Sequence, residues 1–222
     1  MSALHNLVRN NQNSTVERIL EGALRIRKRS EPEAQKLLPD FIDKKDAHGR
    51  TALHLAAYQG NAHIVSLLLQ YGASVHAVAQ DSTTALHFAS QQGHLNVVTQ
   101  LIKKGARVNV KTSKTWMTPL HMALSKGHIN VAVELIKKGA VQKYNSKGIL
   151  PLDMVSEEVE SSLEEALGNE AMERLRDVQD TPKEVKPPVA FYNRKKGKKN
   201  KEVYTEKGAT DNNTQTEINK EN

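Results

Sequence analysis

The chain has 222 residues, of which 38% are hydrophobic and only 4% aromatic, and its formal net charge is +7. No stretch approaches the ~18 apolar residues that a membrane-spanning helix needs, and the first residues lack the apolar core of a secretory signal. Without cysteine there is no disulfide framework and no thiolate metal site. We therefore expect a protein of the cytoplasm and/or nucleus that makes no membrane contact.

The first region, residues 1–45, is predicted to be helical. Ser2-Ala3-Leu4-His5 indicates a helix start. An apolar stripe with helical spacing follows and continues past Gly22; it consists of Val16, Ile19, Leu20, Ala23 and Leu24. Ser30-Glu31-Pro32 then indicates the start of a short further helix, because proline is tolerated in a first helical turn.

Residues 46–145 contain three copies of one pattern. Thr51-Ala52-Leu53-His54 returns as Thr84-Ala85-Leu86-His87 and as Thr118-Pro119-Leu120-His121, at steps of 84 − 51 = 33 and 118 − 84 = 34. Glycines follow each copy at matching offsets. The repeated positions are Thr51, His54, Gly60, Gly72, Thr84, His87, Gly93, Gly105, Thr118, His121, Gly127 and Gly139. A period of this length indicates stacked supersecondary units.

The repeated residue types predict the structure of a unit. Threonine is suited to the N-cap of a first helix, and glycine, which tolerates a left-handed backbone, is suited to the end of each helix. The second helix shows an apolar stripe of Ile64, Val65, Leu68 and Leu69 in one copy, and of Leu95, Val98, Leu101 and Ile102 in the next. Val75 and Val108 are predicted to begin extended segments that lead into the following unit.

These motifs resemble the ankyrin repeat. The resemblance implies an all-α solenoid of helix-turn-helix units joined by hairpin-like loops, and gives six segments: a degenerate N-terminal capping repeat (1–45), three repeats (46–78, 79–112 and 113–145), a C-terminal capping repeat with a helix (146–180), and a basic tail predicted to be disordered (181–222). The distance from Ser2 to Thr51 exceeds one period by about sixteen residues. That extra length is either part of a cap that shields the first repeat or a partner-specific insertion.

The loop before each first helix departs from the pattern twice. Gly49 precedes Thr51 by two residues, whereas Ser82 and Trp116 hold the corresponding later positions. Glycine has a permissive backbone, so we expect these two tips to bend differently. The third unit also has one extra residue between Lys111 and Met117. Trp116, the only tryptophan, is either an exposed binding residue or folds back onto the neighbouring loop.

By the same resemblance, the loop tips and the first-helix surface hold a protein partner. The implied contact residues are His48, Arg50, Tyr58, Gln59, Gln80, Asp81, Gln91, Gln92, Lys114, Trp116, Met117 and Lys126. This surface is polar and basic, which favours a partner with an acidic or polar surface. We expect a non-catalytic adaptor or scaffold that is monomeric alone; an inhibitor of an enzyme is an alternative.

No catalytic or cofactor motif is present. The chain has no G-x-S-x-G, no P-loop and no H-E-x-x-H sequence, so we expect no enzyme, no cofactor and no metal. The resemblance implies that His54, His87 and His121 bind neighbouring backbone and lock the units together. Lys103-Lys104 and Lys137-Lys138 either complement helix dipoles or form a basic stripe.

A last, degenerate copy of the motif lies at Leu150-Pro151-Leu152-Asp153, and the composition of the chain changes in the C-terminal part that follows. Residues 181–222 hold ten Lys/Arg and six Asp/Glu, hence 10 − 6 = +4 of the net charge. They include a dense basic run, formed by Arg194, Lys195, Lys196, Lys198, Lys199 and Lys201. It is a candidate nuclear-targeting signal or contact for an acidic partner, and as a further alternative it binds nucleic-acid phosphates.

Overall fold

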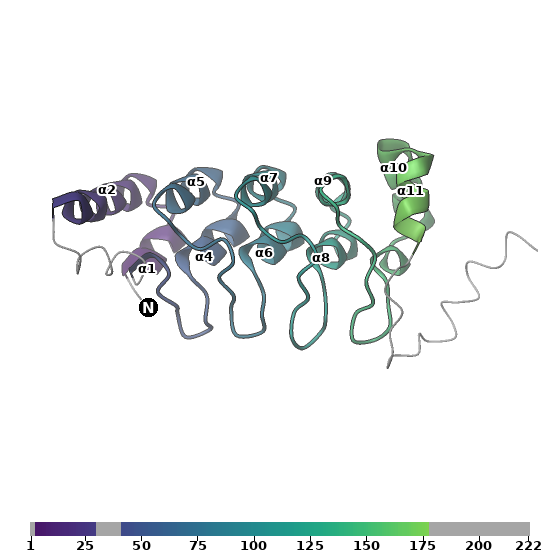
Figure 1. The fold of residues 1–222 in the computed structure, drawn as a ribbon, viewed down its shortest axis with the longest axis horizontal. Helices are drawn as coiled ribbons and strands as arrows, with labels where there is room; N and C mark the ends of the chain where they lie inside the picture. The colour runs from purple at the N-terminus through teal and green to yellow at the C-terminus, as the bar shows by residue number, and fades with distance from the viewer. Residues whose placement is uncertain (1–2, 30–40, 178–222) are drawn as a thin grey trace, which may run out of the picture. The chain divides into compact units, whose positions relative to one another are not determined.

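The computed structural model describes residues 3–29 and 41–177. Their helices form two parallel rows (Figure 1). The inner row consists of α1 (Ala3–Arg9), α4 (Ala52–Gln59), α6 (Ala85–Gln92), α8 (Pro119–Ser125) and the 3₁₀ turn η1 (Pro151–Met154). The outer row consists of α2 (Asn13–Arg29), α5 (Ala62–Gln70), α7 (Leu95–Lys103), α9 (Ile129–Lys137) and α10 (Glu157–Leu167), and α11 (Asn169–Arg176) packs on α10.

Each helix packs against its partner in the same unit and against the equivalent helix of the next unit. Along the inner row α1 contacts α4, α4 contacts α6, and α6 contacts α8, while α2, α5, α7, α9 and α10 follow one another in the outer row. Among the described residues the only β-pairing is an isolated bridge between Val78 and Thr84. The predicted all-α solenoid with hairpin-like loops is confirmed. No described helix could cross a bilayer.

The core runs continuously through the described units. Small residues on the inner helices let neighbouring helices approach closely; Ala56, Ala57, Ala89, Ser90 and Ala123 are all fully buried. The outer-helix stripes are buried mostly as predicted, with one correction. Leu95 is 37% exposed, and Val97 is buried in its place. Leu95 is the first residue of α7, and there its side chain lies outside the packed stripe.

A second correction concerns the segments after the outer helices. Val75 and Val108 lie in turns and not in extended strands. Both are partly buried and pack against the core. The turn follows Gly72 and Gly105, whose φ angles of 93° and 90° place them in the left-handed region, so the chain is already reversing direction where these valines lie.

The predicted threonine N-caps are confirmed and share one arrangement. Thr51, Thr84 and Thr118 each form a reciprocal capping box with the histidine three residues later. The threonine backbone N–H donates to the histidine Nδ1 atom at 3.1–3.2 Å. Because Nδ1 accepts this hydrogen bond, the ring proton must lie on Nε2.

The Nε2 atom of each histidine then reaches the loop of the next unit. His54 donates to the carbonyl of Thr83 at 3.2 Å, His87 to that of Met117 at 3.1 Å, and His121 to that of Ile149 at 3.2 Å. His5 lies 2.9 Å from the carbonyl of Arg50 and so belongs to the same row. Asp153 ends the row: its Oδ2 accepts from the Leu150 N–H at 3.0 Å.

The first unit is longer than the others, as expected. α2 has 17 residues, whereas α5 has 9. Gly22 lies inside α2 and does not end it. Leu4, Val8, Val16 and Leu20 are fully buried and belong to the continuous core. The helix predicted to start at Ser30 lies outside the described residues, as does the tail after residue 177.

Two glycines at the ends of inner helices have a role that their φ angles alone do not reveal. Gly60 and Gly93 cap α4 and α6 with φ of 74° and 79°. The ring of His94 covers Gly60, and the ring of His128 covers Gly93. A Cβ atom at these glycines would lie 2.4 Å and 2.6 Å from the respective Nδ1 atoms. Each ring also binds a backbone carbonyl of the preceding unit, at Tyr58 and Gln91.

We predict that acid destabilises the protein in two pH ranges. Burial lowers the pKa of His54, His87 and His121 to about 4. Between about pH 6.5 and 4 the unfolded chain therefore binds protons that the folded chain excludes. As the pH is lowered through that range, the free energy of unfolding decreases by up to roughly 3 kcal/mol for each histidine. Below about pH 4 the loss continues through Asp46, whose folded-state pKa is about 2. Urea unfolding followed by circular dichroism at several pH values measures this; an unfolding free energy that stays constant from pH 7 to 4.5 would contradict it.

We also predict that Gly60→Ala costs more stability than Gly127→Ala. Both residues have left-handed φ, 74° and 72°, so alanine costs about 1 kcal/mol at either position. At Gly60 the new methyl group also displaces the His94 ring, and we expect a further ~1–3 kcal/mol. Apart from its chain neighbours, no atom lies within 4 Å of the equivalent Cβ at Gly127, which makes it a matched control. Urea unfolding free energies measure both; equal losses would show that His94 does not contribute.

Candidate protein-binding surface

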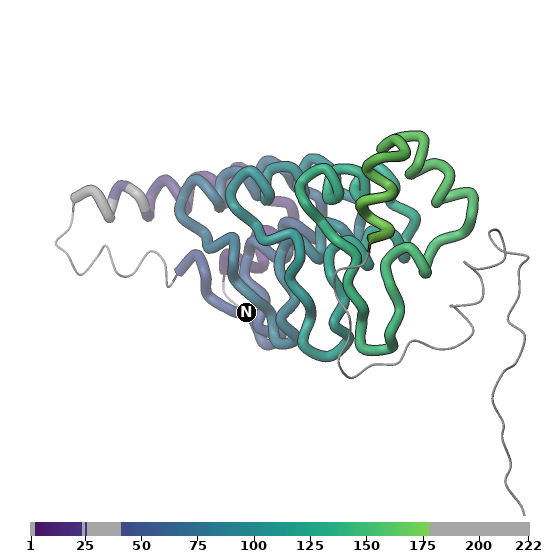
Figure 2. The backbone as a smooth tube through the Cα atoms, turned by 45° about the vertical axis from the view of Figure 1, so that its right-hand side comes forward, coloured from purple at the N-terminus to yellow at the C-terminus, as the bar shows by residue number. Residues whose placement is uncertain are grey.

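Four loops extend side by side from the inner helices (Figures 1 and 2). We call them fingers: residues 46–50, 79–83, 112–117 and 145–149. In each, the first residue donates its N–H to the carbonyl of the last, at 2.8–3.0 Å. The closing pairs are Asp46–Arg50, Ala79–Thr83, Thr112–Met117 and Asn145–Ile149. The third pair spans one residue more than the others, which confirms the extra residue in this loop.

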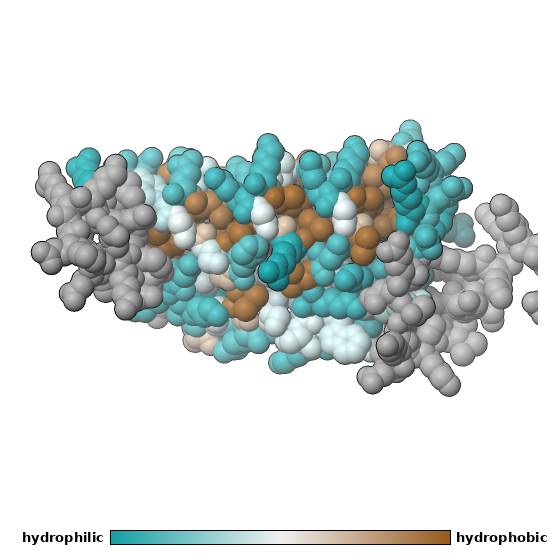
Figure 3. All heavy atoms as spheres, in the orientation of Figure 1, coloured by the Kyte–Doolittle hydropathy of each residue, from teal (hydrophilic) through white to brown (hydrophobic). Residues whose placement is uncertain are grey.

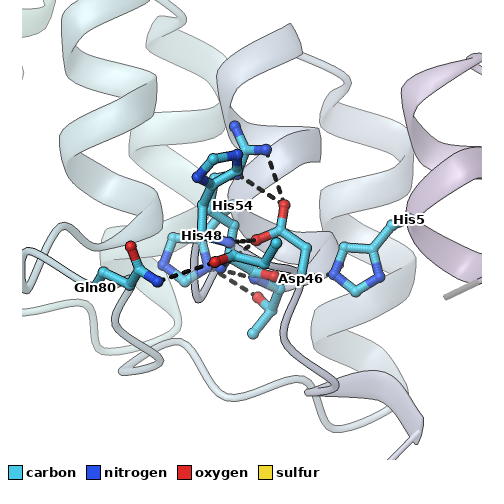
Figure 4. Close-up of polar contacts among 8 residues, drawn as sticks. His5, Asp46, His48, His54 and Gln80 are labelled. Carbon is cyan, nitrogen blue, oxygen red and sulfur yellow. Dashed lines mark hydrogen bonds and ion pairs between the residues drawn. The ribbon is translucent and has the colours of Figure 1, made fainter. Parts of the chain in front are cut away.

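A polar side chain folds back into the tip of the first finger. The Asp46 Oδ1 atom accepts from the backbone N–H of His48 and of Arg50, both at 2.9 Å. Its Oδ2 atom binds the Arg50 guanidinium at 2.8–2.9 Å. Burial alone would raise the pKa of Asp46, but these hydrogen bonds and the charge of Arg50 lower it to about 2. The carboxylate thus stays charged and is used within the finger (Figure 4).

The other fingers are held by related hydrogen bonds. In the fourth, Asn145 Oδ1 accepts from the N–H of Lys147 and of Ile149. In the third, Thr112 Oγ1 accepts from the Met117 N–H at 3.1 Å. The second finger begins with alanine, and there Asp81 accepts from both the N–H and the hydroxyl of Thr83. Each tip is therefore ordered by its own side chains.

The prediction that the second and third tips bend differently is wrong for the second tip. The third tip shares the left-handed φ, but its turn is one residue wider, because the Trp116 N–H donates to the carbonyl of Thr112, four residues back. Ser82 and Trp116 have φ of 62° and 53°, in the same left-handed region as Gly49 at 71° and Gly148 at 70°. A residue with a Cβ atom costs about 1–2 kcal/mol in that conformation. The finger geometry and its hydrogen bonds impose the conformation on whatever residue stands there.

Hydrogen bonds also join each finger to the next. The Gln80 N–H donates to the carbonyl of His48 at 3.3 Å, and its side chain donates to that of Ala47 at 2.9 Å. The Ser113 N–H donates to the carbonyl of Asp81 at 2.8 Å, and the Ser146 N–H to that of Thr115 at 3.0 Å. Figure 4 shows Gln80 reaching from the second finger to the first. The four tips thus form one connected edge.

A shallow pocket of about 260 Å³ lies between the first three fingers and the inner helix α6. It is lined by His48, Arg50, Ala79, Gln80, Asp81, Phe88 and Lys114. Phe88 also makes an edge contact with Tyr58, with ring centroids 6.1 Å apart. We call this pocket, together with Tyr58, the finger groove. Five of the twelve predicted contact residues line the pocket itself.

The remaining predicted residues differ in how available they are. Tyr58 is 50% exposed and Trp116 39%, and Lys126 is exposed beyond the end of α8. Gln91, Gln92 and Met117 are half-buried. The Gln59 side chain donates to the carbonyl of Arg9 at 2.7 Å and so helps to hold α1 against α4. Arg50 is engaged by Asp46. The exposed surface at the finger tips is mostly hydrophilic, while hydrophobic side chains form a band across the helices (Figure 3).

The sequence prediction omitted two groove residues, Ala79 and Phe88, of which Phe88 has the larger side chain. It follows His87 directly, and Leu55 and Met122 hold the same place after His54 and His121. Leu55 is buried, whereas Phe88 and Met122 are half-buried. The sequence therefore contained a signal for this groove position: the residue after each repeated histidine changes in type but stays large and apolar.

The histidine row is a structural feature, as the resemblance implied. Both ring nitrogens of His54, His87 and His121 bind neighbouring groups. Within residues 3–29 and 41–177, no three His, Asp or Glu side chains are grouped closely enough to hold a metal ion. The basic run at 194–201 lies outside this part of the chain.

Comparison with protein families agrees with this architecture. A model described as ankyrin repeats (3 copies) matches residues 4–112. A second model, described as ankyrin repeats (many copies), matches residues 92–136. The first match begins at α1 and therefore includes the altered first unit. Together the two matches extend from the first inner helix into the outer helix α9.

We predict that Ser82→Gly stabilises the protein. Glycine adopts the left-handed φ of this position without steric strain, and this gain exceeds its larger entropy loss on folding by up to about 1 kcal/mol. Urea unfolding measures the change. Gly49→Ala is the reverse control in the first finger, where a Cβ would lie 3.0 Å from the Gln80 nitrogen; it should lower stability. A Ser82→Gly variant less stable than wild type would show that the second tip depends on the serine side chain.

Proposed function

Since the chain belongs to the ankyrin-repeat family, whose repeats are generally non-catalytic protein-interaction modules, we propose that it is an adaptor that holds a protein partner in the finger groove. The observation that carries the proposal is the meeting of exposed Tyr58, half-buried Phe88 and the side chains of three fingers around one pocket. Exposed aromatic rings beside polar and charged groups are typical of binding hot spots.

The charges of the groove favour an acidic or polar partner. Asp46 is buried and paired with Arg50, and Asp81 is bound to Thr83, so both carboxylates are largely engaged within the protein. Lys114 and Lys126 are exposed. Among the described residues no carboxylate lies within ion-pair distance of either lysine. An acidic partner would meet cations whose charge is not already neutralised.

The fingers have a defined structure, which supports a role in binding. Hydrogen bonds within each tip and between neighbouring tips fix the backbone before a partner arrives. A surface ordered in advance loses less conformational entropy on association. Because these hydrogen bonds connect all four fingers, they favour a partner that contacts several fingers at once.

The basic run at 194–201 suggests how the adaptor is directed within the cell. We include in the proposal that it serves as a nuclear-targeting signal or a contact for a second acidic partner. Two weak sites on one chain would strengthen binding through effective concentration. Nucleic-acid binding through the same lysines is the second candidate; it requires affinity for RNA or DNA that falls steeply with salt. Replacing Lys195, Lys196, Lys198 and Lys199 by alanine and comparing localisation and RNA anisotropy separates these roles.

We predict that Tyr58→Ala and Lys114→Glu reduce recovery of the partner captured by the full-length protein, while circular dichroism and thermal unfolding stay close to wild type. Each weakens capture by roughly tenfold or more, as expected for hot-spot residues. The matched controls lie on the outer row: Leu95→Ala removes an exposed apolar side chain of α7, and Lys104→Glu reverses an exposed charge beyond its end. Quantitative affinity capture measures all four. If the groove variants and the outer-row controls recover the same proteins at the same level, the groove assignment fails.

A further inference from the structure

The third fingertip, within residues 112–117, differs from its neighbours in ways that bear on binding. It has one more residue, and the Trp116 N–H donates to the carbonyl four residues back, at Thr112. In the other three fingers the equivalent hydrogen bond reaches only three residues back. The wider turn places the only tryptophan of the chain at the tip, with 39% of its surface exposed.

Trp116 lies at a position whose backbone conformation is unfavourable for a bulky side chain. Its φ of 53° lies in the left-handed region, while the first and fourth fingers have glycine at the same place. A bulky residue in this conformation is strained, and such strain is concentrated at functional sites. Since glycine would meet the backbone requirement without strain, the local fold does not account for the tryptophan.

The backbone that carries Trp116 is held in place by hydrogen bonds. The hydroxyls of Thr112 and Thr115 are 2.8 Å apart, and Thr112 also accepts from the Met117 N–H. On either side, Ser113 and Thr115 are hydrogen-bonded to the second and fourth fingers. The backbone on both sides of Trp116 is thus fixed, and the tryptophan is presented by an ordered loop.

Lysines lie beside the tryptophan in its own loop and in the neighbouring finger. The Lys111 Nζ atom lies over the ring, 5.7 Å from its centroid. Lys114 is exposed two residues away and lines the finger groove, and Lys147 is exposed on the fourth finger. An apolar ring bordered by cations suits an apolar side chain bordered by carboxylates.

From these observations we propose that the third fingertip is an anchoring site for an acidic linear segment of a protein, in which an apolar side chain flanked by Asp or Glu packs on Trp116. The site is continuous with the finger groove through Lys114, so a bound segment runs from the groove along the fingers. This inference rests on the proposed function and adds to it the class of the partner and the residue that selects it.

The first test identifies the ligand without assuming its sequence. Random twelve-residue peptides displayed on phage are selected on the full-length protein. We expect the selected peptides to carry an apolar or aromatic residue with neighbouring acidic residues. Synthetic forms of these peptides should change the fluorescence of Trp116, the only tryptophan, in a saturable and salt-sensitive way. Selection of peptides without acidic residues, or of no peptide at all, overturns the proposal. So does a fluorescence change produced by single-stranded RNA and not by the acidic peptides.

The second test separates a binding role from a structural one. Trp116→Gly relieves the left-handed strain, so its urea midpoint should rise, while its affinity for a selected acidic peptide should fall by at least roughly tenfold. Ser82→Gly relieves the same strain in the second finger and is the matched control, with a higher midpoint and unchanged affinity. A lower midpoint for Trp116→Gly would assign the ring to the fold, and unchanged affinity would remove it from the site.

The outcome for this site can be told apart from that of the groove. If Tyr58→Ala weakens peptide binding and Trp116→Gly does not, the groove stands and the fingertip assignment fails. If neither variant changes binding, both assignments fail. Iodide and caesium quenching of Trp116 adds a measurement that needs no ligand: relative to a free neutral indole, nearby Lys111 and Lys114 should increase quenching by iodide and decrease quenching by caesium, and the reverse would contradict the charge argument.

Discussion

The fold depends on a hydrogen-bonded histidine that joins two kinds of structure. In each repeat the ring accepts from the threonine at its own helix start and donates to a backbone carbonyl in the loop of the next unit, as His54 does between Thr51 and Thr83. The first bond orders a local turn, and the second exists only when the neighbour is in place. Because the ring is buried, both nitrogens must be satisfied. A unit without its neighbour therefore leaves a polar group without a partner, and this couples the units into one stack.

The same bond determines where the fingers lie. The carbonyl that each histidine binds belongs to the far arm of a finger, at Arg50, Thr83, Met117 and Ile149. Packing of the inner helices thus sets the spacing of the fingers, and backbone hydrogen bonds between the tips complete the edge. The finger residues that we propose to bind a partner are therefore positioned by the helix stack although they lie in loops. This is the physical basis for expecting one partner to contact several repeats.

Much of the fold could be predicted because the responsible interactions are local. Threonine caps, the proline at position 119 and the left-handed glycines act within a few residues of themselves, so their pattern along the chain was sufficient. His5 shows the limit of this reasoning. Its motif was recognised, but only the structure shows that it binds Arg50 across 45 residues and so extends the row into the first unit. The roles of Gln59 and Phe88 likewise depend on contacts with other units.

The sequence by itself determined the helical repeat, its period and the extra residue of the third loop, since each is encoded in residue type and spacing along one chain. Only the tertiary structure decided that Trp116 adopts the left-handed backbone of its glycine counterparts, that the His94 ring occupies the space beside Gly60, and that five of the predicted contact residues line one pocket. These features arise where separate units meet. The residue pattern within one unit does not specify the distance to the next unit, because that distance is set by how the helices pack.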